Sequence, residues 1–285
     1  MITDAHCPDR GTSGGRRIRF FGPAALAVLA LVVGLFAAGC RQTGSSPDGG
    51  PEPTTLTIFH AGSLSVPFRE LSALYQQRHP HVKVLAEAAG SRDTARKVSD
   101  LGRSCDVLAS ADFRVVENLL MPAHADFNIR FATGEIVIAY TDESAALEKV
   151  TAEGWPDVLL QDEVTFGRSD PNRDPCGYRT VMVFQLAERH YQRVGLAQQL
   201  GAKHDRKYIR PKETDLLALL EFGELDYLFI YRSVAAQHHL RFLTLPERIN
   251  LSSPKFADLY GQAKVEVTGR KPGETLTISG APIHY

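Results

Sequence analysis

A short run with two Asp-Pro pairs, a cysteine and a glycine carries the clearest chemical signal in this 285-residue chain. The run is "SDPNRDPCGYR", residues 169–179, between an apolar segment and one with helical spacing. Asp174 is well placed to cap a helix, with Pro175 in the first helical position. A cysteine at a helix N-terminus, here Cys176, can have a lowered pKa and act as a nucleophile. The residues alone therefore allow a helix cap, a catalytic thiol or a binding site.

Other polar residues lie where predicted strands meet predicted helices. Ser63 follows one strand in "HAGSLS", and Ser91 follows another in "AAGSRD", placed to cap the next helix. Glu213 lies in the first turn of a helix in "RPKETDLL", and Tyr231 ends the buried strand "DYLFIY". Taken singly, these residues are explained by capping, dipole compensation or packing. Two Gly-Ser turns at successive strand ends also direct free N–H donors toward one place, which favours an anion.

Alternating strands and helices must position these residues. The predicted strands cover residues 55–62, 82–90, 105–112, 135–142, 164–169, 226–231 and 241–246. The predicted helices lie between them, and this alternation indicates α/β layers on parallel sheets. We predict one lobe from residues 55–140 plus 240–285 and a second lobe from residues 141–239. In such sheets ligands bind beyond the carboxyl ends of the strands.

The composition is that of an ordinary globular protein. Apolar residues make up 44% and charged residues 23%, and the net charge of −1 offers no basic field for nucleic acid. The four cysteines are too widely spread for a disulfide scaffold and form no CxxC zinc pair: Cys7, Cys40, Cys105 and Cys176.

The N-terminal segment is typical of an exported protein. Arginines in "GGRRIRFF" precede an apolar run, residues 20–38, and small residues then lead to Cys40. A basic region, an apolar region and a small-residue cleavage site describe an export signal, predicted here for residues 1–40. Cys40 would then carry the lipid of a lipoprotein, although the Arg16-Arg17 pair also allows twin-arginine export. An uncleaved membrane anchor is the alternative.

A flexible tether is predicted to follow. Residues 41–54, "RQTGSSPDGGPEPT", are rich in Gly, Ser and Pro and have almost nothing to bury. The protein would therefore be exported and held by a lipid anchor on the outer face of the cell membrane, or be periplasmic.

Six segments in this order support a resemblance: "FHAGSLSVPF", "EAAGSRDTARKVSDLG", "DVLASAD", "EIVIAYTD", "FGRSDPNRDPCGYR" and "GELDYLFIYRSVAAQH". Together they resemble the tungstate/molybdate-binding proteins of ABC importers, in the archaeal-type branch with the DPCGYR motif. The resemblance covers residues 55–285. It implies a two-lobed type II periplasmic binding protein fold that closes on an oxyanion. It also implies a monomer that works with an ABC permease, is not an enzyme and needs no cofactor.

By the same resemblance, the tungstate or molybdate ligand would be bound by residues of all these turns, with Pro175 and Cys176 contributing backbone: Ser63, Ser91, Asp174, Pro175, Cys176, Glu213 and Tyr231. Asp174 and Glu213 would approach the metal centre of the anion, extending four oxygen ligands toward six. Hexavalent Mo and W are hard ions that accept oxygen ligands, whereas sulfate and phosphate cannot expand so readily. Asp215 competes with Glu213 for this role.

Two alternatives remain from the sequence. The chain could bind sulfate, phosphate or ferric iron, since acids with Tyr231 are compatible with a ferric site. Less consistent is a Cys176-dependent hydrolase, because no histidine motif supplies the base. One departure from the family pattern is that relatives continue beyond "GAPIHY" through another strand and a helix. We therefore predict a first lobe truncated at its C-terminus, with an open sheet edge.

Overall fold

A computed structural model describes residues 52–203 and 206–285. The predicted export signal, Cys40 and the predicted tether up to residue 51 lie outside the described residues. Residues Pro51–Tyr285 form one unit of the chain. No helix in the described ranges is long and apolar enough to cross a membrane.

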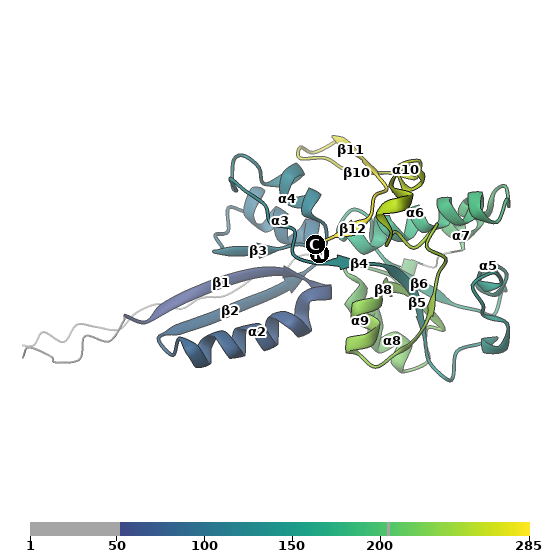
Figure 1. The fold of residues 1–285 in the computed structure, drawn as a ribbon, viewed down its shortest axis with the longest axis horizontal. Coiled ribbons are helices and arrows are strands. Elements are labelled where there is room, and N and C mark those ends of the chain that lie inside the picture. Colours follow the sequence, from purple (N-terminus) through teal and green to yellow (C-terminus); the bar gives the residue numbers. More distant parts are fainter. Residues whose placement is uncertain (1–51, 204–205) are drawn as a thin grey trace, which may run out of the picture. The chain divides into compact units, whose positions relative to one another are not determined.

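The first sheet is parallel and three-stranded, in the order β2-β1-β3. Its elements follow the chain as β1 (Thr54–Ala61), α2 (Ser65–Arg78), β2 (Val82–Ala89), α3 (Ser91–Ser99), β3 (Val107–Ala109) and α4 (Phe113–Leu119). Each strand runs in the same direction because a helix returns the chain between them, as the sequence predicts. Figure 1 shows α2 beside β2, with α3 and α4 together near β3.

The two sides of this first sheet are buried to different extents. Helices α3 and α4 share an apolar cluster that includes Ala95, Val115 and Leu119. Helix α2, in contrast, has no buried residue, and its Leu71 and Leu74 are exposed.

The second sheet is five-stranded and mixed, in the order β7-β6-β8-β5-β9. Its strands are β5 (Ile136–Tyr140), β6 (Phe166–Ser169), β7 (Ile209–Arg210), β8 (Tyr227–Tyr231) and β9 (Arg241–Thr244). Strands β6, β7 and β8 are parallel as predicted, but β5 is antiparallel to both β8 and β9. A strand buried on both faces reads as a continuous apolar run, which carries no information on direction.

The assignment of β5 and β9 differs from the predicted lobe boundaries. The sequence predicts residues 136–140 and 241–244 in the first lobe, but their strands pair within the five-stranded sheet. Backbone pairing, and not position along the chain, decides this membership. The division into lobes otherwise stays a prediction.

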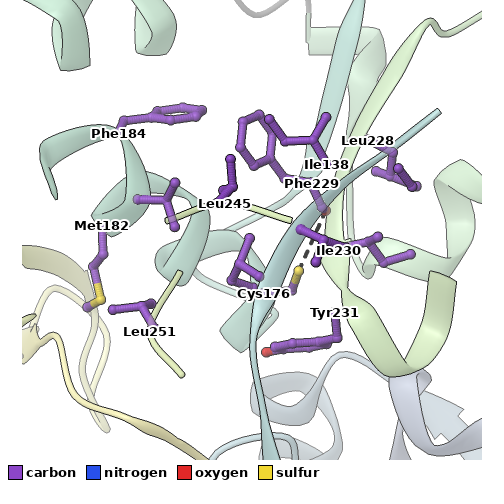
Figure 2. Close-up of a cluster of buried hydrophobic side chains, with 14 of the residues drawn as sticks. Ile138, Cys176, Met182, Phe184, Leu228, Phe229, Ile230, Tyr231, Leu245 and Leu251 are labelled. Atoms are coloured by element: carbon purple, nitrogen blue, oxygen red, sulfur yellow. Dashed lines mark hydrogen bonds between the residues drawn. The ribbon is translucent and has the colours of Figure 1, made fainter. Parts of the chain in front are cut away.

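The main core lies around the five-stranded sheet. Every residue of β8 is buried, and helix α6 (Pro175–His190) packs against the sheet. Phe229 is the centre of an aromatic group, with Phe184 at 5.2 Å and Trp155 at 5.8 Å between ring centroids, both edge-to-face. Figure 2 shows Phe184 and Phe229 among the aliphatic side chains of this core. Such burial fixes the ends of β8 and α6, where the candidate site lies.

Smaller elements complete the described chain. Two antiparallel pairs join β4 (Thr133–Gly134) to β12 (Ile283–His284) and β10 (Lys264–Thr268) to β11 (Thr275–Ser279). The remaining α-helices are α5 (Trp155–Leu159), α7 (Leu196–Ala202), α8 (Leu217–Glu221), α9 (Arg232–Gln237) and α10 (Ala257–Tyr260). Short 3-10 helices are η1 (Gly62–Leu64), η2 (Leu147–Lys149), η3 (Arg206–Tyr208), η4 (Glu213–Leu216) and η5 (Pro254–Phe256).

Candidate functional site

Two acidic side chains meet at the N-terminus of α6. Asp174 is the N-cap residue and Pro175 follows in the first turn, as predicted, but the Asp174 side chain makes no capping hydrogen bond. Its Oδ2 instead accepts a hydrogen bond of 3.3 Å from the backbone N–H of Glu213, the first residue of η4. Both residues are only 1% exposed. Asp174, which the sequence predicts at the start of a helix, therefore lies beside a second buried acid, Glu213.

The pKa values of this pair reflect an environment that disfavours charge. Burial raises the pKa of Asp174, and burial together with the Asp174 carboxylate raises the pKa of Glu213 well above its usual range. Neither carboxylate oxygen of Glu213 has a hydrogen-bond partner among the described residues. A buried acid in this state requires a proton or a positive centre to satisfy it.

Ser63 lies at the end of β1 within η1, where its hydroxyl is buried and has no hydrogen-bond partner in the described chain. The N-cap of η1 is Ala61, so Ser63 is not a cap. Gly62 explains how η1 and η4 approach each other, because a Cβ on Gly62 would lie 2.8 Å from Thr214 Oγ1. The turn after β1 is thus held against the turn that carries Glu213.

Ser91 is the first residue of α3, and the N-cap is Gly90, which corrects the predicted capping role. The Ser91 Oγ accepts a hydrogen bond of 2.9 Å from the N–H of Ala111. A Cβ on Gly90 would lie 2.4 Å from the carbonyl oxygen of Arg173, so glycine permits α3 to begin directly against the turn before α6. The starts of α3 and α6 are therefore neighbours, as a shared site requires.

Tyr231, at the end of β8, belongs to a buried polar network. Its hydroxyl oxygen accepts a hydrogen bond of 2.7 Å from Arg179, and Arg179 also pairs with Asp112 at 3.1 Å. Asp112 accepts a further hydrogen bond of 2.6 Å from the Tyr178 hydroxyl and pairs with Arg114 at 3.0 Å. Burial opposes ionisation of Asp112, but these cationic and hydrogen-bonding partners lower its pKa. The network joins the N-cap of α4 to α6 and β8.

Sequence reasoning missed this network. Tyr178 and Arg179 end the DPCGYR motif, and Asp112 ends the predicted strand "CDVLASAD". A charged side chain on the buried face of a predicted helix was the available signal for Arg179, since such a charge needs a partner. The partner is Asp112, which lies 67 positions before Arg179 in the sequence, and only the tertiary fold shows this pairing.

A family comparison matches residues 56–264 to the bacterial extracellular solute-binding proteins. The chain belongs to this family. A solute-binding protein of Petrotoga mobilis is 49% identical over 81% of this chain and 72% of its own length. A protein of Thermococcus kodakarensis named molybdate/tungstate-binding protein WtpA is 43% identical over 90% and 78%, respectively. These relatives confirm the resemblance predicted from the motifs, and the family description indicates an exported protein.

Solved structures agree on the fold of this solute-binding protein. The periplasmic molybdate-binding protein of Azotobacter vinelandii gives a TM-score of 0.52 at 17% identity, over 68% of this chain and 80% of that one. The sulfate-binding protein SubI of Mycobacterium tuberculosis gives 0.53 at 16% identity, over 68% and 71%. This likeness confirms the predicted fold class, an α/β type II periplasmic binding protein fold. At such low identity it carries nothing about the ligand.

The surroundings of Cys176 in this solute-binding protein disfavour a reactive thiolate. Its side chain points into the core, where Sγ lies 3.7 Å from the carbonyl oxygen of Phe229, in a weak hydrogen bond (Figure 2). Burial and the nearby carboxylates of Glu213 and Asp174 raise its pKa well above the usual value for a thiol. The thiolate that a nucleophile requires is therefore disfavoured. Cys176 therefore presents only its backbone at the N-terminus of α6.

The remaining competitors for the site are also placed. Asp215 forms an ion pair with Lys212 and is partly exposed, so Glu213 and not Asp215 is the acid beside Asp174. Among residues 52–203 and 206–285, no group of three or more His, Cys, Asp or Glu side chains could hold a metal ion. Asp174 and Glu213 together offer carboxylate oxygens, and the backbone N–H of Glu213 donates to one of them.

Proposed function

We propose that this chain captures tungstate or molybdate and delivers it to the permease of an ABC importer. The observation that carries the proposal is the pair of buried acids, Asp174 and Glu213, which a hydrogen bond from the Glu213 backbone to the Asp174 carboxylate holds together. Other anions would be repelled by such a pair, since like charges a few Å apart interact unfavourably even at an effective dielectric of about 20. The names of the relatives from Thermococcus kodakarensis and Pyrococcus abyssi support the same ligand.

The proposed mechanism divides the anion between two kinds of contact. The carboxylates of Asp174 and Glu213 approach the hexavalent metal, whose hard, electropositive centre accepts additional oxygen ligands. The hydroxyls of Ser63, Ser91 and Tyr231 and the backbone at Pro175 and Cys176 surround the anion oxygens. Pro175 has no N–H, so the backbone donor of this turn is Cys176.

The Arg179 contact gives Tyr231 a defined role in this mechanism. Arg179 donates to the Tyr231 oxygen, so the hydroxyl proton of Tyr231 is left to donate to the ligand. Ser91 is similar, because its oxygen already accepts from Ala111 and its proton is left for another acceptor. Both residues are therefore donors toward the site, which an oxyanion requires.

Selectivity follows from the carboxylate pair. Sulfur and phosphorus in their oxyanions do not expand their coordination, so sulfate and phosphate would meet the acids without a compensating bond. Ferric iron would need more oxygen ligands than the pair supplies. We further propose that the protein acts as a monomer, is not an enzyme, and is attached to the outer face of the membrane through a lipid on Cys40.

A thermal-unfolding series with separate anions tests the function. A bound ligand stabilises the folded protein in proportion to the logarithm of its concentration over its dissociation constant. We expect tungstate and molybdate to raise the melting temperature at micromolar concentration, and sulfate, phosphate and ferric citrate to leave it unchanged. Stabilisation by one of the last three alone would contradict the proposal.

A further inference from the structure

We propose that Tyr285 is an additional ligand-binding residue, whose hydroxyl donates a hydrogen bond to an oxygen of the bound anion. The inference rests on the proposed function and extends it, because the predicted site does not include this residue. Its starting point is that the Tyr285 hydroxyl is buried and has no hydrogen-bond partner among the described residues. A buried tyrosine hydroxyl usually finds a partner, so an orphan one points to a missing group.

The Tyr285 hydroxyl shares its surroundings with the candidate site. Its ring lies 5.5 Å from the ring of Tyr231 in an edge-to-face arrangement. Burial raises the pKa of this hydroxyl, and the neighbouring hydroxyls of Ser233 and Ser63 lower it, but neither serine completes a hydrogen bond with Tyr285 Oη. Charges on Arg179 and Glu213 also act on this tyrosine. The orphan atoms of Ser63, Glu213 and Tyr285 thus come from three separate segments and face one region.

The backbone fixes where the Tyr285 ring can lie. The residue follows β12, and its N–H donates to Ala132 at 2.9 Å while its carbonyl accepts from Phe131 at 3.1 Å. Gly134 in β4 lies under the ring, where an added Cβ would be 3.1 Å from Tyr285 Cε2. Two backbone hydrogen bonds and a glycine therefore hold the ring in one place, which a pre-organised contact needs.

The chemistry of the site calls for such a donor. The two carboxylates can only accept hydrogen bonds or bind a metal, so the anion oxygens depend on hydroxyl and N–H donors. Burial raises the pKa of Tyr285, so its hydroxyl keeps its proton near neutral pH. A neutral hydroxyl also adds no further negative charge beside Asp174 and Glu213.

Calorimetric titration of the Tyr285→Phe variant with tungstate tests this role, because phenylalanine keeps the ring and removes only the hydroxyl. We expect the dissociation constant to rise about tenfold, as for loss of one hydrogen bond to a charged group. The melting temperature without ligand should stay the same or rise, because an unsatisfied hydroxyl is removed. The matched control is Tyr227→Phe, whose buried hydroxyl already bonds to the carbonyl oxygen of Ala145. That control should lower the melting temperature and change tungstate affinity less than twofold.

A second variant makes the test independent of the hydroxyl deletion. Gly134→Ala should displace the Tyr285 ring by a few tenths of an ångström and weaken tungstate binding in a protein that still contains the hydroxyl. If the unmodified chain binds tungstate and Tyr285→Phe binds it with the same affinity, the proposed role of Tyr285 is wrong. The proposed function would then still stand. If the unmodified chain binds neither tungstate nor molybdate, the proposed function is wrong and this inference is overturned with it.

Discussion

The carboxylate of Asp174 accepts a hydrogen bond from the backbone N–H of Glu213 at 3.3 Å, so two acids 39 positions apart are held together in the protein interior. The contact fixes the turn before η4 against the start of α6. It also places two groups of the same charge where water cannot screen them. The folded protein tolerates this arrangement at a cost, and a bound ligand can relieve it.

Removing one charge of the pair should separate stability from binding. In Asp174→Asn, the amide oxygen still accepts from Glu213, but the buried charge is gone. We expect the free energy of unfolding without ligand to rise by about 1–2 kcal/mol and tungstate affinity to fall roughly 10- to 100-fold. Urea denaturation and calorimetry measure the two effects. Asp215→Asn is the matched control, and it should change tungstate affinity less than twofold. A parallel loss of stability and affinity in Asp174→Asn would contradict this account.

The same pair predicts how stability depends on pH. Burial raises the pKa of Asp174 and of Glu213, so above about pH 4 the unfolded chain releases these protons before the folded chain does. The folded state then binds more protons, and the contribution of the pair to stability falls as pH rises. The stability gained in Asp174→Asn should therefore be small at pH 4 and larger at pH 7. Urea melts across this range measure the difference, and a gain that shrinks with rising pH would disprove it.

Asp112 should contribute strongly to the stability of the folded protein. It is fully buried and pairs with Arg179 and Arg114, so removing the carboxylate leaves the buried Arg179 and the partly buried Arg114 without this ion pair. We expect Asp112→Ala to lower the free energy of unfolding by about 3–5 kcal/mol. The exposed Asp142–Arg241 pair is the control, and Asp142→Ala should cost less than about 1 kcal/mol. Equal losses in urea denaturation would show that the Asp112 network is not structural.

The contribution of Asp112 to stability should also depend on pH, and its dependence should be opposite in direction to that of the Asp174–Glu213 pair. Its partners lower its pKa, so its contribution is complete above about pH 4 and is lost as pH falls through the folded-state value. Wild type should therefore lose its advantage over Asp112→Asn on acidification. An advantage that is independent of pH between 2 and 6 would contradict the lowered pKa.

Cys176 should contribute to packing and not to binding through its side chain. Cys176→Ala keeps the backbone N–H at the start of α6, so tungstate affinity should change less than about threefold. The lost sulfur contacts in the core should cost about 1–2 kcal/mol of unfolding free energy. In the native protein iodoacetamide should leave Cys176 unmodified, as peptide mass spectrometry can verify after urea-free labelling. Rapid modification of Cys176 in the native protein would show that its thiol is accessible and reactive.

Much of the fold could be predicted from local patterns. The alternation of apolar strands with helical segments predicts the α/β class, and Asp174 followed by Pro175 predicts the start of α6 correctly. Strand direction could not be predicted in the same way. The run that forms β5 is buried along Ile136–Ala139, and such a run reads alike for parallel and antiparallel strands.

The candidate site was predictable only in part. Ser63, Glu213 and Tyr231 stand out in the sequence because each lies at the end of a predicted strand or the start of a predicted helix, and their role in binding stays a prediction. Ser91 was also found, but Gly90 takes the capping position that we assigned to it. Asp112 and Tyr285 do not stand out in the sequence, because their contacts with Tyr178 and Tyr231 are formed only in the tertiary fold. Whether a buried polar atom has a hydrogen-bond partner can be seen only in the three-dimensional structure.

Calorimetric titration of wild type and Asp174→Ala with tungstate and with sulfate tests the central claim most directly. The account predicts saturable binding of tungstate to wild type, little or no binding of sulfate, and a large loss of tungstate affinity in Asp174→Ala. Alanine removes the proposed ligand of the metal centre, so discrimination between the two anions should fall with it. Unchanged affinities for both anions in Asp174→Ala would contradict the claim that these carboxylates recognise the metal of the oxyanion.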